Sequence, residues 1–363
     1  MNLFKKQKQN SNPTSSFENE GTNAEGSMSA SQMPSSYPLD YREIMYSRPY
    51  SIGKRQKRKK MGRLNALSVT LFFLVMMALF LTVGSLIQYF LGMAGLALTE
   101  VMFLVCSLAF VKIMGADFRE VFPIRKPKWI GLAGVLTIWA GSFLASDILS
   151  VILMMLAPDE LSEMSDSMMG TFGTTPPFVT FLIVACLPPV CEEAMHRGVI
   201  QTGIRNSVKN KWMLVLIMGA FFALYHIYPI RYLTIGFLGC VLSYILAESG
   251  NMVYSSFFHF VQNGSALLFS AIAEKIADPE IFDGLAETAA DSTLLGSSLA
   301  IYGPPAILLL YAGAYLLKRA EAPVRPSFLP KGKEKKTLAL LIGSCGGLFA
   351  AGVLIAAISM FFK

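Results

Sequence analysis

The chain has 363 residues, of which 53% are hydrophobic and 15% are charged, and its formal net charge is +7 at pH 7. This composition excludes an ordinary soluble domain and predicts a polytopic membrane protein. Several nearly uncharged stretches are long enough to cross a hydrocarbon core of about 30 Å as helices, and none alternates as the strands of a membrane barrel do.

The N-terminal segment, residues 1–62, is rich in Ser, Asn, Gln and Pro and poor in apolar residues. Because so few apolar groups cannot offset the entropy cost of ordering the chain, we predict a disordered, basic cytoplasmic tail. The tail ends near the run KRQKRKK, Lys54 to Lys60, just before the first apolar stretch. A cytoplasmic anchor that binds anionic lipids is expected there, and no nucleic-acid partner is expected.

The rest of the chain, residues 63–363, is predicted to be a transmembrane domain. Its fold class is all-α, a polytopic helical bundle of about eight to nine spans. The candidate spans are the most apolar stretches, at residues 64–90, 96–115, 130–156, 177–200, 212–228, 232–247, 252–273, 298–317 and 337–361.

The positive charges are distributed unevenly between the segments that connect these spans. If the N-terminus is inside, the inner segments hold 21 of the 31 Lys and Arg residues and the outer segments hold three. Because cytoplasmic loops keep positive charge, this asymmetry predicts a multi-pass protein of the cell membrane with a cytoplasmic N-terminus.

Ionisable and amide side chains gather in three of the predicted spans. A charged group at the centre of a membrane helix costs about 2.5–3.5 kcal/mol, so a cluster of such groups marks a functional site by default. All three histidines of the chain belong to these clusters. The residues are Glu192, Glu193, His196 and Arg197 in the fourth span, His226 in the fifth, and His259 and Asn263 in the seventh.

Helix geometry refines this picture in the fourth span. Glu193 and Arg197 are four residues apart and share a helix face, so we predict an ion pair between them. Pro188 and Pro189 are expected to break the helix, which would place Glu192 and Glu193 in the first turn of a new segment. The positive end of that segment would then favour both carboxylates.

Straight helices would leave the three clusters at different depths. At a rise of about 1.5 Å per residue, His226 lies roughly 21 Å and His259 roughly 10 Å from the inner ends of their spans. We therefore expect the proline break, a tilt or a deeper start of the fifth span to bring the clusters together.

These groups allow two kinds of chemistry. A carboxylate helped by a histidine can accept a proton from water, while a second histidine and an amide stabilise the oxyanion of acyl transfer. Two histidines and a carboxylate are also a common zinc set. The sequence contains no GxSxG or HExxH motif, which leaves hydrolysis by an activated water. We favour a mechanism with no required cofactor, because His259 and Asn263 suit oxyanion donation without a metal. Zinc is the alternative, with its ligands left unassigned.

Three short motifs carry a family resemblance. EEAMHR, FALYH and HFVQN, which begin at Glu192, Phe222 and His259, fit the EExxxR, FxxxH and HxxxN motifs in order. In these motifs residues 177–270 resemble the CAAX-protease and bacteriocin-processing family, also called the Abi family, of intramembrane endopeptidases, and they form the predicted peptidase-like core. The resemblance implies hydrolysis of a peptide bond in a membrane-associated protein or peptide.

The resemblance also implies a role for each matching residue. Glu192 would be the general base that activates water, and His226 would hold that water, with Phe222 packed beside His226. Glu193 and Arg197 would form the ion pair that fixes the segment. His259 and Asn263 would form the oxyanion site.

Three polar residues do not fit the motif pattern. Family members commonly have Phe immediately before the arginine, where this chain has His196. His196 is open to three interpretations, as a lipid-facing residue, a member of the site or a sign of altered chemistry. Glu100 and Asp147 match no motif, and we expect them to serve packing or to line a water cavity.

Two other functions are compatible with these residues. A noncatalytic relative of the same fold could act as a scaffold, immunity or regulatory protein, and a small-solute transporter could use the buried charges as an ion pathway. In a peptidase, replacement of Glu192 by Gln should abolish cleavage, whereas a scaffold should keep most of its function. Uptake by a transporter should depend on Glu100 or Asp147 more than on His259.

Overall fold

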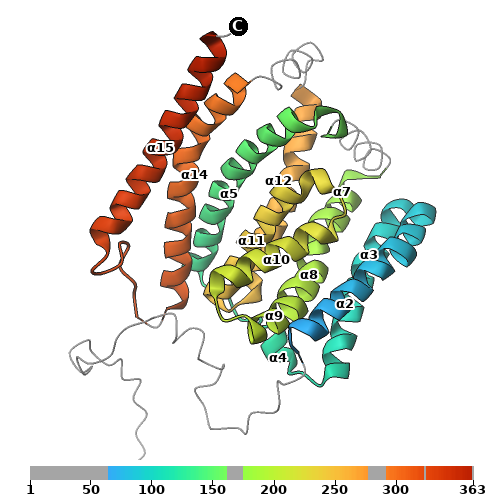
Figure 1. Cartoon of the computed structure of the whole chain (residues 1–363). Coiled ribbons are helices and arrows are strands. Elements are labelled where there is room, and N and C mark those ends of the chain that lie inside the picture. Colours follow the sequence, from blue (N-terminus) through green and yellow to red (C-terminus); the bar gives the residue numbers. More distant parts are fainter. Residues whose placement is uncertain (1–63, 162–174, 277–291, 323, 362–363) are drawn as a thin grey trace, which may run out of the picture. The chain divides into compact units, whose positions relative to one another are not determined.

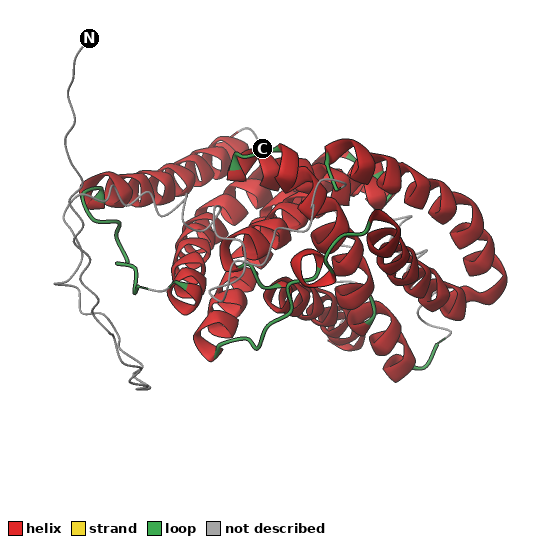
Figure 2. Cartoon of the chain, turned by 90° about the horizontal axis from the view of Figure 1, so that it is seen from below, coloured by secondary structure: helices red, strands yellow, loops and turns green. Residues whose placement is uncertain are grey.

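The computed structural model describes residues 64–161, 175–276, 292–322 and 324–361, all within one compact unit, Tyr50–Lys363. In this part of the chain every regular element is a helix and no strand is present (Figure 2), which confirms the all-α prediction. The predicted tail and its basic run Lys54–Lys60 lie outside the described residues.

The helices follow the predicted apolar stretches closely (Figure 1). Short π-helical or 3₁₀ turns, labelled η, interrupt several of them. The elements are α2 (Ala66–Leu79), η1 (Phe80–Gly84), α3 (Ser85–Met114), α4 (Phe118–Val121), α5 (Trp129–Leu156), α7 (Pro177–Thr180), η2 (Phe181–Cys186), α8 (Pro188–Glu193), η3 (Ala194–Ile200), α9 (Gln201–Ser207), α10 (Lys211–Tyr225), η4 (Pro229–Arg231), α11 (Tyr232–Ser249), α12 (Met252–Ile276), α14 (Ser292–Glu321) and α15 (Glu334–Phe361).

Within the described ranges, six helical stretches are long and apolar enough to cross a membrane, which makes the chain a multi-pass membrane protein. The first stretch, Ala66–Met114, contains two of the predicted spans. It folds back at Gly92, whose φ of 51° and ψ of −125° are not helical. The side chain of Gln88 donates a hydrogen bond of 3.2 Å to the hydroxyl of Thr99 across this turn. A residue with a Cβ would be strained at that φ, so glycine allows the reversal.

The fourth predicted span is a helix with two π-helical segments, η2 and η3. Leu187 keeps helical φ and ψ before the two prolines, and its N–H donates to the carbonyl of Leu182 at 3.2 Å. The prolines therefore change the backbone hydrogen bonds but do not end the helix. Proline has no N–H, and the first positions of a helical segment such as α8 need no N–H donor. The predicted placement of Glu192 and Glu193 in the first turn is wrong, since they are the last two residues of α8.

The segments predicted to be inner contact one another at one end of the helices. Asn206 donates a hydrogen bond of 2.8 Å to the carbonyl of Leu64, and Glu248 forms ion pairs with Lys211 and Lys318 at 2.6 and 3.5 Å. Such contacts require the connecting segments to lie on the same side of the membrane, as the charge pattern predicts. That this side is the cytoplasm stays a prediction.

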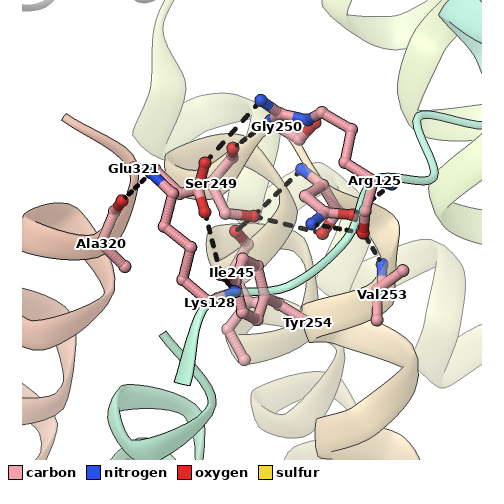
Figure 3. Close-up of polar contacts among 10 residues, drawn as sticks. Arg125, Lys128, Ile245, Ser249, Gly250, Val253, Tyr254, Ala320 and Glu321 are labelled. Carbon is pink, nitrogen blue, oxygen red and sulfur yellow. Dashed lines mark hydrogen bonds and ion pairs between the residues drawn. The ribbon is translucent and has the colours of Figure 1, made fainter. Parts of the chain in front are cut away.

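The connector before α5 is fastened to the turn between α11 and α12 (Figure 3). The guanidinium of Arg125 donates to the carbonyls of Ser249 and Gly250 at 2.8 and 2.9 Å. Asn251 accepts from the backbone N–H of Arg125 and donates to its carbonyl, each at 3.1 Å. These bonds fix the chain just before α12 begins.

A hydroxyl of α12 extends this network to α14 (Figure 3). Tyr254 donates to a carboxylate oxygen of Glu321 at 2.8 Å and accepts from the backbone N–H of Lys128 at 2.8 Å. Arg125 adds an ion pair with Glu321 at 3.7 Å. The start of α12 is thereby held from two sides, and His259 follows on the same helix after somewhat more than one turn.

Candidate active site

The fourth and seventh predicted spans meet at a buried ion-pair cluster. A carboxylate oxygen of Glu193 lies 3.0 Å from a guanidinium nitrogen of Arg197, and neither side chain is exposed. The same oxygen, Oε1, lies 3.2 Å from Nδ1 of His259. The ion pair predicted from the spacing is therefore present, and it has a third member that the sequence did not reveal. A carboxylate buried between two nitrogen donors is far less costly than an unpaired one.

Glu192 lies on the other side of the same imidazole ring. Its Oε2 is 3.9 Å from Nε2 of His259, and only 7% of the residue is exposed. Among the described residues this oxygen has no hydrogen-bond partner. His259 is thus placed between two carboxylates, one bonded to Nδ1 and one facing Nε2.

The end of α10 brings His226 to the cluster. Nδ1 of His226 lies 2.8 Å from the carbonyl oxygen of Phe222, and both His226 and His259 contact the ring of Phe222. A carbonyl only accepts, so Nδ1 carries the proton and Nε2 keeps a lone pair when the ring is neutral. The next residue, Ile227, has a φ of 50°, which is strained for a β-branched residue and occurs mainly at functional sites.

Phe222 is the centre of the aromatic packing that joins these groups. Its ring makes edge contacts with His226 and His259 at centroid distances of 4.7 and 6.0 Å. The guanidinium carbon of Arg197 lies 4.4 Å from the centre of the same ring, a cation–π distance. The predicted packing of Phe222 beside His226 is present, and the ring also supports the buried arginine.

Glycines let α10 and α11 approach closely enough to fix this ring. A Cβ at Gly239 would lie 2.7 Å from Cβ of Phe222, closer than real side chains come. Replacement of Gly239 by Ala should therefore displace Phe222, reduce activity and lower the free energy of unfolding by about 1–3 kcal/mol. Thermal unfolding and cleavage assays of the purified protein would measure both effects.

Gly236, one turn earlier on α11, provides a matched control. A Cβ there would meet Ala223 at 3.5 Å, an ordinary contact distance. The Gly236→Ala variant should keep stability and activity near the wild-type values. Equal behaviour of the two variants would contradict the proposed positioning of Phe222.

The end of the first motif and the residues after it attach the fourth predicted span to α11. The guanidinium of Arg197 donates to the carbonyl of Gly239 at 3.3 Å, and the amide of Gln201 donates to the carbonyl of Ser243 at 3.1 Å. Donors four residues apart thus meet acceptors four residues apart. This register sets the orientation of Arg197 and, through it, of Glu193.

His196 lies behind the cluster and packs as an aromatic ring. Its ring makes edge contacts with Phe222 and Tyr225, each at a centroid distance of 5.0 Å, and the residue is fully buried. Neither ring nitrogen has a hydrogen-bond partner among the described residues. Of the three interpretations, the lipid-facing one is wrong, and the surroundings favour a packing role in the place of the usual phenylalanine.

Replacement of His196 by Phe should keep the cleavage rate and stabilise the protein. An unsatisfied buried polar group costs about 1–3 kcal/mol, and phenylalanine removes two such nitrogens while keeping the ring. Thermal unfolding in detergent and initial cleavage rates would test this. A tenfold loss of rate in a well-folded variant would instead assign His196 to the chemistry.

Asn263 is the remaining motif residue. Its Nδ2 donates a hydrogen bond of 3.0 Å to the carbonyl of Val184 in η2. A side-chain amide has two N–H donors, so one remains available to a substrate. The π-helical distortion of η2 is the element that supplies the accepting carbonyl next to α12.

One acid outside the motifs also reaches this cluster. Glu100 of α3 is 4% exposed, and its carboxyl forms a side-chain hydrogen bond with Glu192. The expectation that Glu100 only packs or lines a cavity therefore missed a direct contact. No sequence signal pointed to it, because Glu100 and Glu192 are far apart in the chain and match no common motif.

The donor arrangement does not fit the zinc alternative. In the part of the chain that the structure describes, no three His, Cys, Asp or Glu side chains are grouped as metal ligands. We therefore derive the chemistry from the side chains alone.

Comparison with known families identifies the segment that carries these groups. Residues 174–265 match the family model described as "Rce1-like: Type II CAAX prenyl endopeptidase Rce1-like". The match spans all three motifs and confirms the resemblance found in the sequence. No curated protein and no solved structure matches the chain.

Proposed function

We propose that this chain, whose residues 174–265 match the Rce1-like family model of type II CAAX prenyl endopeptidases, is an intramembrane endopeptidase that cleaves a membrane-associated protein or peptide. The observation that carries the proposal is the convergence of two carboxylates on one buried imidazole, with Glu193 at 3.2 Å and Glu192 at 3.9 Å from His259. Structural ion pairs alone do not require a carboxylate oxygen without a hydrogen-bond partner.

Glu192 is proposed as the general base. Its Oε2 and Nε2 of His226 are both acceptors, so together they can bind the two hydrogens of one water molecule. That arrangement leaves a lone pair of the water oxygen for attack on a peptide carbonyl. Glu192 takes the water proton as the new C–O bond forms, which is ordinary general-base catalysis.

His259 and Asn263 are proposed to stabilise the oxyanion. Glu193 accepts from Nδ1 of His259 and fixes the orientation of the ring. When both ring nitrogens carry a proton, Nε2 can donate to the oxyanion. The remaining N–H of Asn263 provides a second donor. Preorganised donors of this kind are usually the largest electrostatic contribution to acyl transfer.

The tetrahedral intermediate then collapses with the proton that Glu192 received. The carbon–nitrogen bond breaks and the proton passes to the leaving amine, which leaves a carboxylic acid on the other fragment. This acid then gives its proton to the amine or to solvent and becomes a carboxylate. Arg197 balances the charge of Glu193 throughout these steps. The Glu193–Arg197 pair fixes the geometry and is not consumed.

Membranes that contain the wild type or the Glu192→Gln variant provide the test. Peptide mass spectrometry should find cleavage products only with the wild type, and a parallel sample with a metal chelator should give the same products. Prenylated and unprenylated forms of one reporter peptide would show whether the lipid is recognised. Identical profiles from the wild type and the variant would instead support a noncatalytic scaffold.

A further inference from the structure

A carboxyl group from the N-terminal hairpin, the stretch Ala66–Met114 that folds back at Gly92, contacts the proposed general base. Glu100 lies on α3, which packs against α8 and η3, the elements of the first motif. Its carboxyl forms a side-chain hydrogen bond with Glu192, while its own Oε2 has no partner among the described residues. A buried polar atom without a partner costs free energy, and an ionisable residue in such a position within a membrane span is a candidate functional residue.

The surroundings of Glu100 offer no positive charge to balance an anion. Among the described residues, none of the Lys, Arg or His side chains lies within 4.0 Å of its carboxylate oxygens, whereas Glu193 has both Arg197 and His259. The aromatic residues Phe103 and Tyr225 make an edge contact at 5.2 Å next to it on α3 and α10. An ionised Glu100 would be an unpaired charge next to a second carboxylate.

We propose that Glu100 keeps its proton and donates a hydrogen bond to Glu192, and that it thereby acts as a positioning residue for the general base. Two carboxyl groups can share a hydrogen bond only if one of them carries a proton. The pairing rests on the proposed function, since it matters only if Glu192 accepts the proton of a water molecule.

The consequence is a fixed orientation of the general base. Glu100 holds the Glu192 side chain in one orientation by a charge-assisted hydrogen bond, the stronger kind. The N-terminal hairpin, which the family match does not include, would thus contribute to the site.

Three variants of the full-length protein in liposomes test the proposal. Glu100→Leu removes the donor and should lower kcat about 10- to 100-fold with KM little changed, the loss expected for a hydrogen bond to a charged group. Glu100→Gln keeps an N–H donor that cannot ionise and should recover most of this loss. Asp147→Asn, at another half-buried intramembrane acid, is the control and should behave as the wild type.

The opposite results would overturn the proposal. Wild-type kcat in Glu100→Leu would mean that the carboxyl only fills space, because an apolar side chain of similar size would then serve as well. A Gln variant as slow as the Leu variant would mean that an ionised Glu100 is needed.

Infrared spectroscopy provides a readout that does not need a substrate. The wild type should show the carbonyl stretch of a protonated carboxylic acid, and Glu100→Gln should lose it while Asp147→Asn keeps it. Absence of the Glu100-dependent band would refute the inference even in an active enzyme. If the band is present and no substrate is ever cleaved, only the proposed function fails.

Discussion

Replacement of Glu192 by glutamine is expected to lower kcat about 100- to 10,000-fold, the usual contribution of a positioned general base. Glutamine keeps the size of the side chain and can still accept a hydrogen bond, but its amide does not take a proton from water. Since the residue is buried and has no ion pair shorter than the 3.9 Å contact with His259, the unfolding temperature should change little. Single-turnover cleavage by purified protein in liposomes would measure the effect.

An exposed acid outside the site provides the control for this experiment. Glu160 lies just beyond the end of α5 and is exposed. The Glu160→Gln variant should cleave at the wild-type rate. A Glu192→Gln variant that also cleaves at that rate would remove Glu192 from the chemistry, whatever its contacts.

Replacement of Arg197 by leucine is expected to destabilise the protein by about 3–5 kcal/mol. The change leaves the carboxylate of Glu193 buried without its guanidinium partner, which is the costly way to break a buried ion pair. The loss should appear in the free energy of unfolding in mixed micelles. Activity should also disappear, because Arg197 no longer holds Glu193, and Glu193 in turn holds His259.

A double variant separates charge balance from catalysis. With Glu193→Leu added, no carboxylate is left unpaired at this position, so much of the lost stability should return while cleavage stays absent. Arg119→Leu, an exposed arginine on α4, should change stability by no more than about 0.5 kcal/mol. Equal destabilisation by Arg197→Leu and Arg119→Leu would contradict the importance of the buried pair.

Span positions could be predicted because bilayer length and apolar composition restrict them strongly. The predicted stretch 130–156 and the observed helix Trp129–Leu156 differ by one residue, and 232–247 lies within Tyr232–Ser249. It could also be predicted which connecting segments lie together at one end of the helices, because the basic segments gather on one side of the membrane. Both features follow from local composition, which the sequence displays directly.

The arrangement inside the site could be predicted only in part. The Glu193–Arg197 pair is local, and a four-residue spacing on a helix is enough to predict it. The bond from His259 to Glu193 joins residues 66 positions apart, and no local pattern encodes such a distance. The contact of Glu100 with Glu192 is equally long-range, so it required coordinates.

Backbone distortions in the fourth span are one departure from the straight helices that the depth estimate assumed. The estimate assumed regular helices, whereas η2 and η3 add π-helical turns on both sides of Glu192. A π-helical turn changes both the rise and the direction of side chains. Such turns depend on packing against α12 and α11 and leave little trace in the sequence besides Pro188 and Pro189.

A single turnover in water labelled with heavy oxygen tests the central claim, that Glu192 activates a water molecule for direct attack on the peptide bond. One labelled oxygen should enter the new C-terminal carboxylate of the peptide, none should enter the side chain of Glu192, and Glu192→Gln should form no product. Label in the Glu192 carboxylate, or a peptide covalently attached to the enzyme, would contradict direct attack by water.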